Sequence, residues 1–426
     1  MQLRIERAIY GGAGLARHEG KAVFVPFTLP GELVEAEIAE EKRSYATAEL
    51  VSVLEASEDR RLPPCRYYGT CGGCHYQHAD YAAQPGMKAA ILRETLERAR
   101  IREIPEISTL SGEPLGYRNR VRLHVERNPF SLCYKYRNSH RNLPVESCPI
   151  AAPALQRAIE VLHREGGALG LGGWVKEVEL FAAGDEPILV SFFTDAAPKA
   201  AERALAASWS GLVDVLPAIA GAAIFSASDD RSPLRRLAHL GEESLIYPSQ
   251  GRRYCVSSGS FFQTNRFLID SLIQTVIGEE KGGIAWDLYA GVGLFSLPLT
   301  QDFTSVVAVE ASASAVRDLR ENLRGTTHRI VASDTAAFLR RAVEQRTPAP
   351  DLAVVDPPRA GLGAAATSAL GKLRPRKITY VSCDPATLSR DLAGLLESGY
   401  RLRKIHLVDL FPQTFHLESV THLSLG

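Results

Sequence analysis

Two residues capable of covalent and acid–base chemistry stand at the ends of apolar segments in the second half of the chain. Asp356 follows the segment DLAVV and precedes two prolines, whose fixed φ stiffens the turn and directs the carboxylate. Cys383, in VSCDP, holds the equivalent position after the next apolar segment. On this spacing alone, a small buried residue is the commoner interpretation of the cysteine. Cys383 becomes a candidate nucleophile if it shares a crevice with a cofactor.

A glycine-containing turn indicates such a cofactor. In Asp287-Leu-Tyr-Ala-Gly291-Val-Gly293, two glycines let the backbone approach a ligand closely. Glu310 ends the next apolar segment, where a carboxylate can bind ribose hydroxyls. A dinucleotide-binding turn has a third glycine or alanine where Ser296 stands. The turn and the acid together favour a nucleoside-type cofactor, with S-adenosylmethionine ahead of NAD.

Three clustered cysteines predict a metal site. Cys65, Cys71 and Cys74 follow the pattern C-x5-C-G-G-C, and Cys133 or Cys148 can supply a fourth thiolate. Structural zinc sites prefer two C-x2-C pairs, and the segment holds only one. The spacing also differs from the C-x3-C-x2-C of radical enzymes that cleave S-adenosylmethionine. A four-cysteine iron–sulfur cluster therefore fits better than zinc or a disulfide framework.

Asp356 and Cys383 can act together only in a fold that brings the ends of their strands to one place. From about residue 259, apolar segments alternate with helix-compatible ones, which predicts a doubly wound parallel sheet with a ligand crevice at the carboxyl ends of its strands. The expected strands lie within IAWDLYAGVGLF and within residues 306–310, 328–334, 351–358 and 377–385.

The first part of the chain indicates other elements. Short apolar stretches between residues 3 and 53 alternate with turns such as GGAG and LPGE, which is typical of a small antiparallel β-barrel. Residues 55–64 form an expected linker, and an Ala-rich helix is expected near 152–164. A further amphipathic helix is expected from residue 87 to about 100. Its predicted apolar side carries Met87, Ile91, Thr95 and Ala99.

Composition excludes collagen-like, low-complexity and wholly disordered proteins, and 426 residues predict two to four domains. No apolar run of 18 residues or secretory leader is apparent, so we expect a cytoplasmic protein with no membrane partner. The 49 basic and 49 acidic residues balance, but residues 117–142 carry seven bases and one acid. This stretch is either a contact surface for nucleic-acid phosphates or a solvated face.

Several motifs together resemble one family, the S-adenosylmethionine-dependent RNA uracil-C5-methyltransferases, and in particular its iron–sulfur branch that acts on 23S ribosomal RNA. The resemblance covers nearly the whole chain. It implies an α/β Rossmann-like class I methyltransferase domain at 251–426, a TRAM/OB-like RNA-binding β-barrel at 1–56, and a cluster-bearing α+β region at 57–250. The motifs are GGAGLARHEGKAVFVPFTLPGE, CGGC, FFQTN, DLYAGVG, VDPPRAG, VSCDPATLSRD and DLFPQTFHLE.

The same resemblance implies roles for individual residues. The implied ligands of a [4Fe-4S] cluster are Cys65, Cys71, Cys74 and Cys148, which leaves Cys133 and Cys255 as interior cysteines. The implied cofactor contacts are Gln263, Tyr289, Gly291, Gly293, Glu310 and Asp356, with Asp334 near the adenine. Cys383 is the implied nucleophile and Glu418 the implied general base. Phe261 or Phe262 is a candidate to stack on an extruded base, and His416 is expected to be structural.

The implied reaction is transfer of a methyl group from S-adenosylmethionine to C5 of a uridine in 23S ribosomal RNA, through a covalent bond between Cys383 and C6. Arg118, Arg120, Arg122 and the bases at 134–141 are the expected RNA contacts, since the barrel is acidic. A tRNA uridine is an alternative substrate, and an RNA-binding ribosome assembly factor is an alternative function. We expect a monomer with no obligate protein partner.

Overall fold

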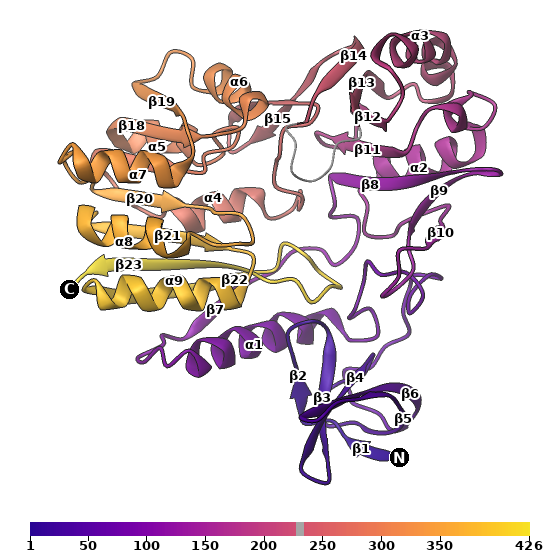
Figure 1. The fold of residues 1–426 in the computed structure, drawn as a ribbon, viewed down its shortest axis with the longest axis horizontal. Helices are drawn as coiled ribbons and strands as arrows, with labels where there is room; N and C mark the ends of the chain where they lie inside the picture. The colour runs from indigo at the N-terminus through magenta and orange to yellow at the C-terminus, as the bar shows by residue number, and fades with distance from the viewer. Residues whose placement is uncertain (227–233) are drawn as a thin grey trace.

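The computed structural model describes residues 1–226 and 234–426, so residues 227–233 of the predicted central region lie outside the described residues. Three bodies of secondary structure follow one another along the chain: a small barrel-like sheet, a central sheet and a large C-terminal sheet (Figure 1). Among the described residues, no helix is long and apolar enough to cross a membrane.

The N-terminal sheet has six strands in the order β1-β5-β6-β4-β3-β2. Its strands alternate buried and exposed residues, so one face forms a small core that includes Val23, Val25 and Val34. The expected short strands are therefore confirmed. Their bounds are β1 Gln2–Arg4, β2 Arg7–Ala8, β3 Ala13–His18, β4 Lys21–Pro26, β5 Leu33–Glu41 and β6 Tyr45–Glu55.

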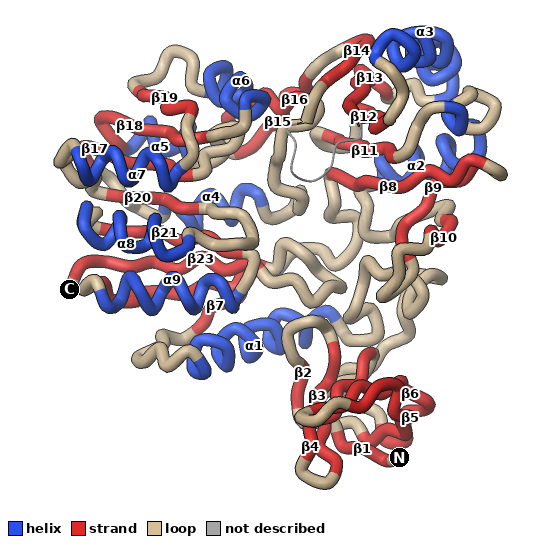
Figure 2. Tube along the Cα trace, in the orientation of Figure 1, coloured by secondary structure: helices blue, strands red, loops and turns tan. Residues whose placement is uncertain are grey.

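The central sheet has seven strands in the order β10-β9-β8-β11-β12-β13-β14. Helices α2 and α3 pack against it, and the Ala-rich helix expected near 152–164 is confirmed as α2. The elements are β8 Arg120–Arg127, β9 Phe130–Lys135, β10 Asn142–Pro144, α2 Pro153–Glu165, η2 Leu171–Gly173, β11 Glu177–Ala182, β12 Ile188–Thr194, α3 Pro198–Val215, β13 Ile219–Ser226 and β14 Arg236–Gly241. The hairpin β15 Ser244–Ser249 and β16 Arg252–Ser257 follows (Figure 2).

The C-terminal sheet has eight strands in the order β19-β18-β17-β20-β21-β23-β22-β7. Strands β17, β18, β19, β20 and β21 pair in parallel, which confirms the predicted strands, whereas β23 pairs antiparallel with both neighbours. The strands are β17 Gly282–Leu288, β18 Phe303–Glu310, β19 His328–Ala332, β20 Leu352–Val355, β21 Lys377–Ser382, β22 Tyr400–Val408 and β23 Glu418–Leu425. The helices are α4 Ile269–Ile277, α5 Ser296–Asp302, α6 Ala313–Asn322, α7 Thr335–Glu344, α8 Gly363–Leu373 and α9 Pro385–Glu397.

Two elements from the middle of the chain join this C-terminal sheet. Strand β7 (Ile107–Leu110) pairs in parallel with β22 at the sheet edge, and α1 (Gln84–Arg98), preceded by the short helix η1 (Tyr81–Ala83), packs against α9 (Figure 1). The expected helix is confirmed, and the predicted apolar side is correct for Ile91 but not for Met87, Thr95 and Ala99, which are only partly buried. The sequence pattern selected Met87 and Thr95, whereas the structure buries Lys88, Leu92 and Leu96. Because a lysine occupies one of its core positions, the buried side of α1 does not show a regular hydrophobic period in the sequence.

Candidate active site

A cavity of about 570 Å³ lies at the carboxyl edge of the C-terminal sheet. Parallel strands end at a common edge, so β17, β18, β20 and β21 deliver the residues that follow them to one crevice. Tyr289, Glu310, Asp356 and Cys383 all line it. The other predicted site residues that line it are Phe261, Gln263, Gly291 and Glu418.

The glycine turn after β17 has a backbone that few side chains allow. Gly291 has φ +54° and Tyr289 has φ +68°. The Gly291 N–H donates to Glu310 Oε2 at 2.8 Å, and the Ser312 N–H donates to Glu310 Oε1 at 2.7 Å. A carboxylate oxygen can accept two hydrogen bonds, and Glu310 lines the cavity, so each oxygen has capacity for one more. This arrangement fixes Glu310 where it can accept hydrogen bonds from a ribose.

Buried polar side chains hold this turn in place. The Asn322 amide group donates to the Val292 carbonyl at 2.8 Å and accepts from the Cys255 N–H at 2.6 Å. The Ser296 hydroxyl donates to the buried Asp287 carboxylate, which explains why a serine replaces the glycine or alanine of a dinucleotide-binding turn. The turn is therefore braced against β16 on one side and β17 on the other.

Strand pairing places Cys383 opposite Glu418. In the antiparallel ladder between β21 and β23, Ser382 pairs with Ser419, so the next residues outward are Cys383 and Glu418. The sequence separates them by 35 residues, yet the register makes them neighbours at the edge of the cavity. The side chains of Cys383 and Glu418 thus line the same part of the cavity.

Burial and mutual repulsion raise the pKa values of the acids in this cavity. Burial, together with the charges of Glu418 and Asp356, raises the pKa of Cys383 to about 12, although Arg359 lowers it. Burial also raises the pKa of Asp356 to about 7 and that of Glu418 well above its usual range. In the free protein Cys383 is therefore a thiol at neutral pH. A cation bound here would lower all three pKa values.

Some expected residues lie outside the cavity lining, and some lining residues carried no expected role. Asp334 caps α7 through the Ala337 N–H, and Gly293 packs so closely against Leu319 that a Cβ would lie 2.7 Å from its Cδ1. Phe262 is buried in the core, which leaves the 63% exposed Phe261 as the residue able to stack on a base. The lining residues without an expected role include Arg359 and Phe411. His416, expected to be structural, also lines the cavity, and burial lowers its pKa to about 4.

A second cavity, of about 610 Å³, is lined by the cysteines predicted to bind a metal. Its lining includes Cys65, Cys71, Cys74 and Cys148, but not Cys133 or Cys255. All seven cysteines lie within the described residues and none forms a disulfide. In the described part of the chain, no group of three Cys, His, Asp or Glu side chains is arranged to hold a single metal ion.

The sheet order, the braced glycine turn and the acidic crevice define a class I methyltransferase with a site for a nucleoside-type cofactor. Residues 240–425 match the family described as tRNA (Uracil-5-)-methyltransferase, and residues 1–51 match the TRAM domain. The chain is 34% identical over 433 residues to an uncharacterized RNA methyltransferase of Aquifex aeolicus, covering 100% of this chain and 98% of that protein.

The chain is also 33% identical over 429 residues to the 23S rRNA (uracil(1939)-C(5))-methyltransferase RlmD of Pectobacterium atrosepticum, covering 96% of this chain and 90% of that protein. The chain therefore belongs to the S-adenosylmethionine-dependent RNA uracil-C5-methyltransferases. The expected enzyme class, cofactor and TRAM domain are thereby confirmed.

A solved structure has the same fold over its whole length. The Pyrococcus abyssi tRNA (uracil-54, C5)-methyltransferase in complex with S-adenosyl-L-homocysteine superposes with a TM-score of 0.75 at 22% identity. The match covers 99% of this chain and 100% of that one. The order of barrel, central region and methyltransferase sheet is therefore shared by the two proteins.

Asp356→Asn is expected to stabilise the protein at neutral and alkaline pH. Because folding raises the pKa of Asp356 from 3.8 to about 7, the folded state binds more protons between these values, so wild-type stability falls as pH rises. Above pH 7 the variant should gain on the order of 1–3 kcal/mol in free energy of unfolding, and below about pH 4 the two should converge. Urea denaturation across this pH range measures the difference.

The matched control is Asp351→Asn, at the opposite end of β20. Backbone N–H groups of Ile284 and Gly283 lower the pKa of Asp351, so its charge stabilises the folded state above about pH 4. This control should lose stability at neutral pH. Equal pH dependence in the two variants would contradict the assignment of a buried, destabilising charge to Asp356.

Proposed function

We propose that the enzyme methylates C5 of a specific uridine in 23S ribosomal RNA through a covalent adduct between Cys383 and uracil C6. The observation that carries the mechanism is the register of β21 and β23, which aligns Cys383 with Glu418 beside the cofactor turn. The substrate class is supported by the relatives named as 23S rRNA (uracil(1939)-C(5))-methyltransferases. In this proposal residues 1–56 and 57–250 bind RNA, and residues 251–426 catalyse the reaction.

The order of bond changes follows from the reactivity of uracil. C5 is a weak nucleophile until the Cys383 sulfur bonds to C6, which turns the ring into an enolate. S-adenosylmethionine supplies an electrophilic methyl group on a positively charged sulfur, and C5 takes this methyl. Glu418 then removes the proton from C5, and the electron pair that remains expels the Cys383 sulfur and restores the double bond.

The first step, formation of the bond between Cys383 and uracil C6, requires a base that accepts the thiol proton. Because Cys383 is a thiol at neutral pH, its proton must leave as the bond to C6 forms. Asp356 shares the cavity, and with a pKa of about 7 it is partly ionised near neutral pH and can accept this proton. The positive charge that Arg359 brings lowers the pKa of both Cys383 and Glu418, so Arg359 favours the reactive ionisation states.

A 5-fluorouridine-substituted RNA is expected to trap the enzyme. Fluorine at C5 cannot leave as a proton, so the bond to Cys383 persists and survives denaturant. Incubation with cofactor and ribosomal or tRNA transcripts, followed by denaturing electrophoresis, should show an adduct on ribosomal RNA only. Cys383→Ala should abolish the adduct, whereas Cys255→Ala, a half-buried cysteine outside the cavity, should retain it.

The remaining outcomes separate mechanism from substrate. An adduct on tRNA alone would retain the covalent mechanism and replace the substrate. Methyl transfer by Cys383→Ala would exclude the covalent mechanism.

We further propose that Cys65, Cys71, Cys74 and Cys148 hold a [4Fe-4S] cluster. Each thiolate of such a cluster binds a different iron, so its ligands surround a cavity more widely than the ligands of one ion. The buried Arg118 lies beside Cys148, and its Nε has no hydrogen-bond partner among the described residues. A buried guanidinium without an ion-pair partner is costly, and a negatively charged cluster would offset its charge. The donor set and the charge therefore both fit the group.

Anaerobically purified enzyme is expected to contain about four iron atoms per chain, as this cluster requires. Cys71→Ser should lower the iron content and weaken RNA binding, because the ligand is lost. Cys133→Ser is the matched control and should keep both, since Cys133 is buried outside this cavity. Iron assay and filter binding measure the two effects. Full iron content in Cys71→Ser would contradict the assignment.

In this proposal only part of the expected RNA-contact surface is available to phosphates. Arg120 pairs with Glu179 at 2.7 Å and lies over the Phe181 ring, and Arg118 lines the cysteine cavity with its Nε buried, so both are already engaged within the protein. The exposed bases of the same stretch include Arg141, which lies over the ring of Tyr136. Arg141 is thus the better candidate for an RNA contact.

Arg141→Ala is expected to raise KM for RNA and to reduce the dependence of log KM on log salt by roughly one unit, because one phosphate contact is lost. The matched control Arg203→Ala removes an exposed arginine of α3 and should change neither value. Steady-state kinetics at several salt concentrations measure the slopes. Equal slopes for Arg141→Ala and wild type would remove Arg141 from the RNA surface.

A further inference from the structure

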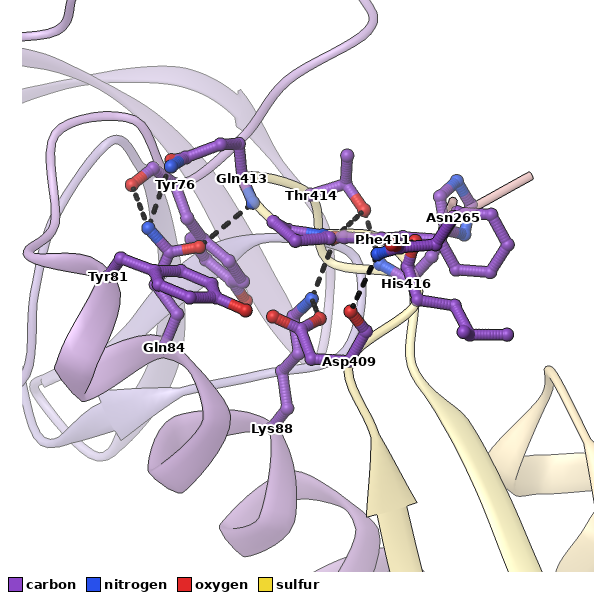
Figure 3. Close-up of polar contacts among 12 residues, drawn as sticks. Tyr76, Tyr81, Gln84, Lys88, Asn265, Asp409, Phe411, Gln413, Thr414 and His416 are labelled. Atoms are coloured by element: carbon purple, nitrogen blue, oxygen red, sulfur yellow. Dashed lines mark hydrogen bonds and ion pairs between the residues drawn. The ribbon is translucent and has the colours of Figure 1, made fainter. Parts of the chain in front are cut away.

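The loop between β22 and β23 forms one wall of the catalytic cavity. It begins at Asp409 and ends at Glu418, and it contributes Phe411 and His416 to the cavity lining. Its backbone follows no regular ladder over most of its length, so side-chain contacts fix this wall of the cavity. Glu418 itself is paired in the ladder with Val408, the residue directly before Asp409. Figure 3 shows that many of these contacts come from outside the C-terminal domain sequence.

Lys88 of helix α1 makes the central contact. Its Nζ lies 2.6 Å from Asp409 Oδ1 and donates to the Phe411 carbonyl at 2.9 Å (Figure 3). Both charged side chains are 0% exposed. Removing two charges from water costs several kcal/mol each, and apolar residues of similar volume often stabilise a core as well or better. Stability alone therefore gives no reason for a lysine at this core position.

Gln84 holds the same loop from one helical turn earlier. Its Oε1 accepts the Gln413 N–H at 2.9 Å, and its Nε2 donates to Gln413 Oε1 at 3.0 Å. Residues four apart lie on one face of a helix, so Gln84 and Lys88 fix two points of the loop against a single rigid element. The spacing between these points is then set by the helix rather than by the loop.

Further contacts connect the loop to segments that already have roles. The N–H groups of His75 and Tyr76, next to Cys74, donate to the Gln413 carbonyl at 2.7 and 2.9 Å. Asn265, from the segment that supplies Gln263, donates to the Leu410 carbonyl at 3.1 Å. The loop is thus held between the cysteine segment, helix α1 and the cofactor segment.

We propose that Lys88 is a positioning residue for methyl transfer, acting through Asp409 and the Phe411 carbonyl to fix the cavity wall and Glu418. The assignment rests on the proposed role of Glu418. Lys88 neutralises Asp409 and also spans from it to the backbone two residues further on, which an apolar side chain cannot do. Its loss should impair the chemical steps while leaving the RNA-binding surface unchanged.

The test compares Lys88→Met with wild type in the full chain, using the ribosomal or tRNA transcript that the wild type methylates. Misplacement of catalytic groups by about 1 Å can lower a rate by two orders of magnitude, so kcat should fall roughly ten- to a hundredfold. KM for RNA should stay within about twofold. Slow proton removal by Glu418 should also make a methylated, denaturant-stable protein–RNA adduct accumulate on unsubstituted RNA.

Two variants separate positioning from folding. Lys88→Met combined with Asp409→Asn leaves no buried charge, so its unfolding temperature should return toward wild type while kcat stays low. Ile91→Val is the matched control, because it loosens packing of the same helix without touching the loop, and its kcat should be near wild type. Recovery of kcat in the double variant, or a raised KM with unchanged kcat in Lys88→Met, would overturn the proposal.

The adduct experiment tests the covalent mechanism, and the kinetic experiment tests the role of Lys88. Absence of any adduct on 5-fluorouridine-substituted RNA from wild type and variants alike, with methyl transfer intact on unsubstituted RNA, would contradict the covalent mechanism. The comparison of kcat with KM does not use the adduct, so it would still decide the role of Lys88.

Discussion

The antiparallel insertion of β23 between β21 and β22 is the constraint on which the catalytic site depends. A purely parallel sheet would deliver only residues that follow its strands, because all its carboxyl ends meet at one edge. Strand β23 runs the other way, so it delivers its first residue, Glu418, to that same edge. Side chains alternate faces along a strand, so a slip of one residue would turn Glu418 away from Cys383.

Because three acidic side chains meet at this edge of the sheet, their pKa values are shifted. Asp356, Glu418 and Cys383 are acids in a shared, largely dry cavity, and each raises the pKa of the others or is raised by burial. In the free enzyme these acids therefore hold protons that must leave during the proposed reaction. A positively charged cofactor shifts all three acids toward their reactive forms, so occupancy of the site and activation of the nucleophile are physically linked.

Segments that are distant in sequence complete the catalytic domain. Helix α1 and strand β7 pack on the C-terminal sheet, and Tyr10 of the N-terminal barrel places its hydroxyl 3.4 Å from Asp384, beside Cys383. The Tyr10 ring also contacts Phe415, with centroids 5.3 Å apart. The catalytic cavity is thus supported by the barrel and the cysteine segment as well as by the sheet that carries its reactive groups.

The sequence by itself determined the local features. Apolar segments ending in Glu310, Asp356 and Cys383 predicted the parallel strands and their common edge, because strand periodicity and turn chemistry are properties of neighbouring residues. Tertiary structure alone decided the pairing of Cys383 with Glu418, the burial of Lys88 and the pairing of Arg120 with Glu179. These depend on sheet register and on packing between distant segments. Charge and hydrophobicity patterns predict that Lys88 and Arg120 are exposed. The local sequence around a basic residue is the same whether that residue is exposed or buried against an acid that is distant in sequence.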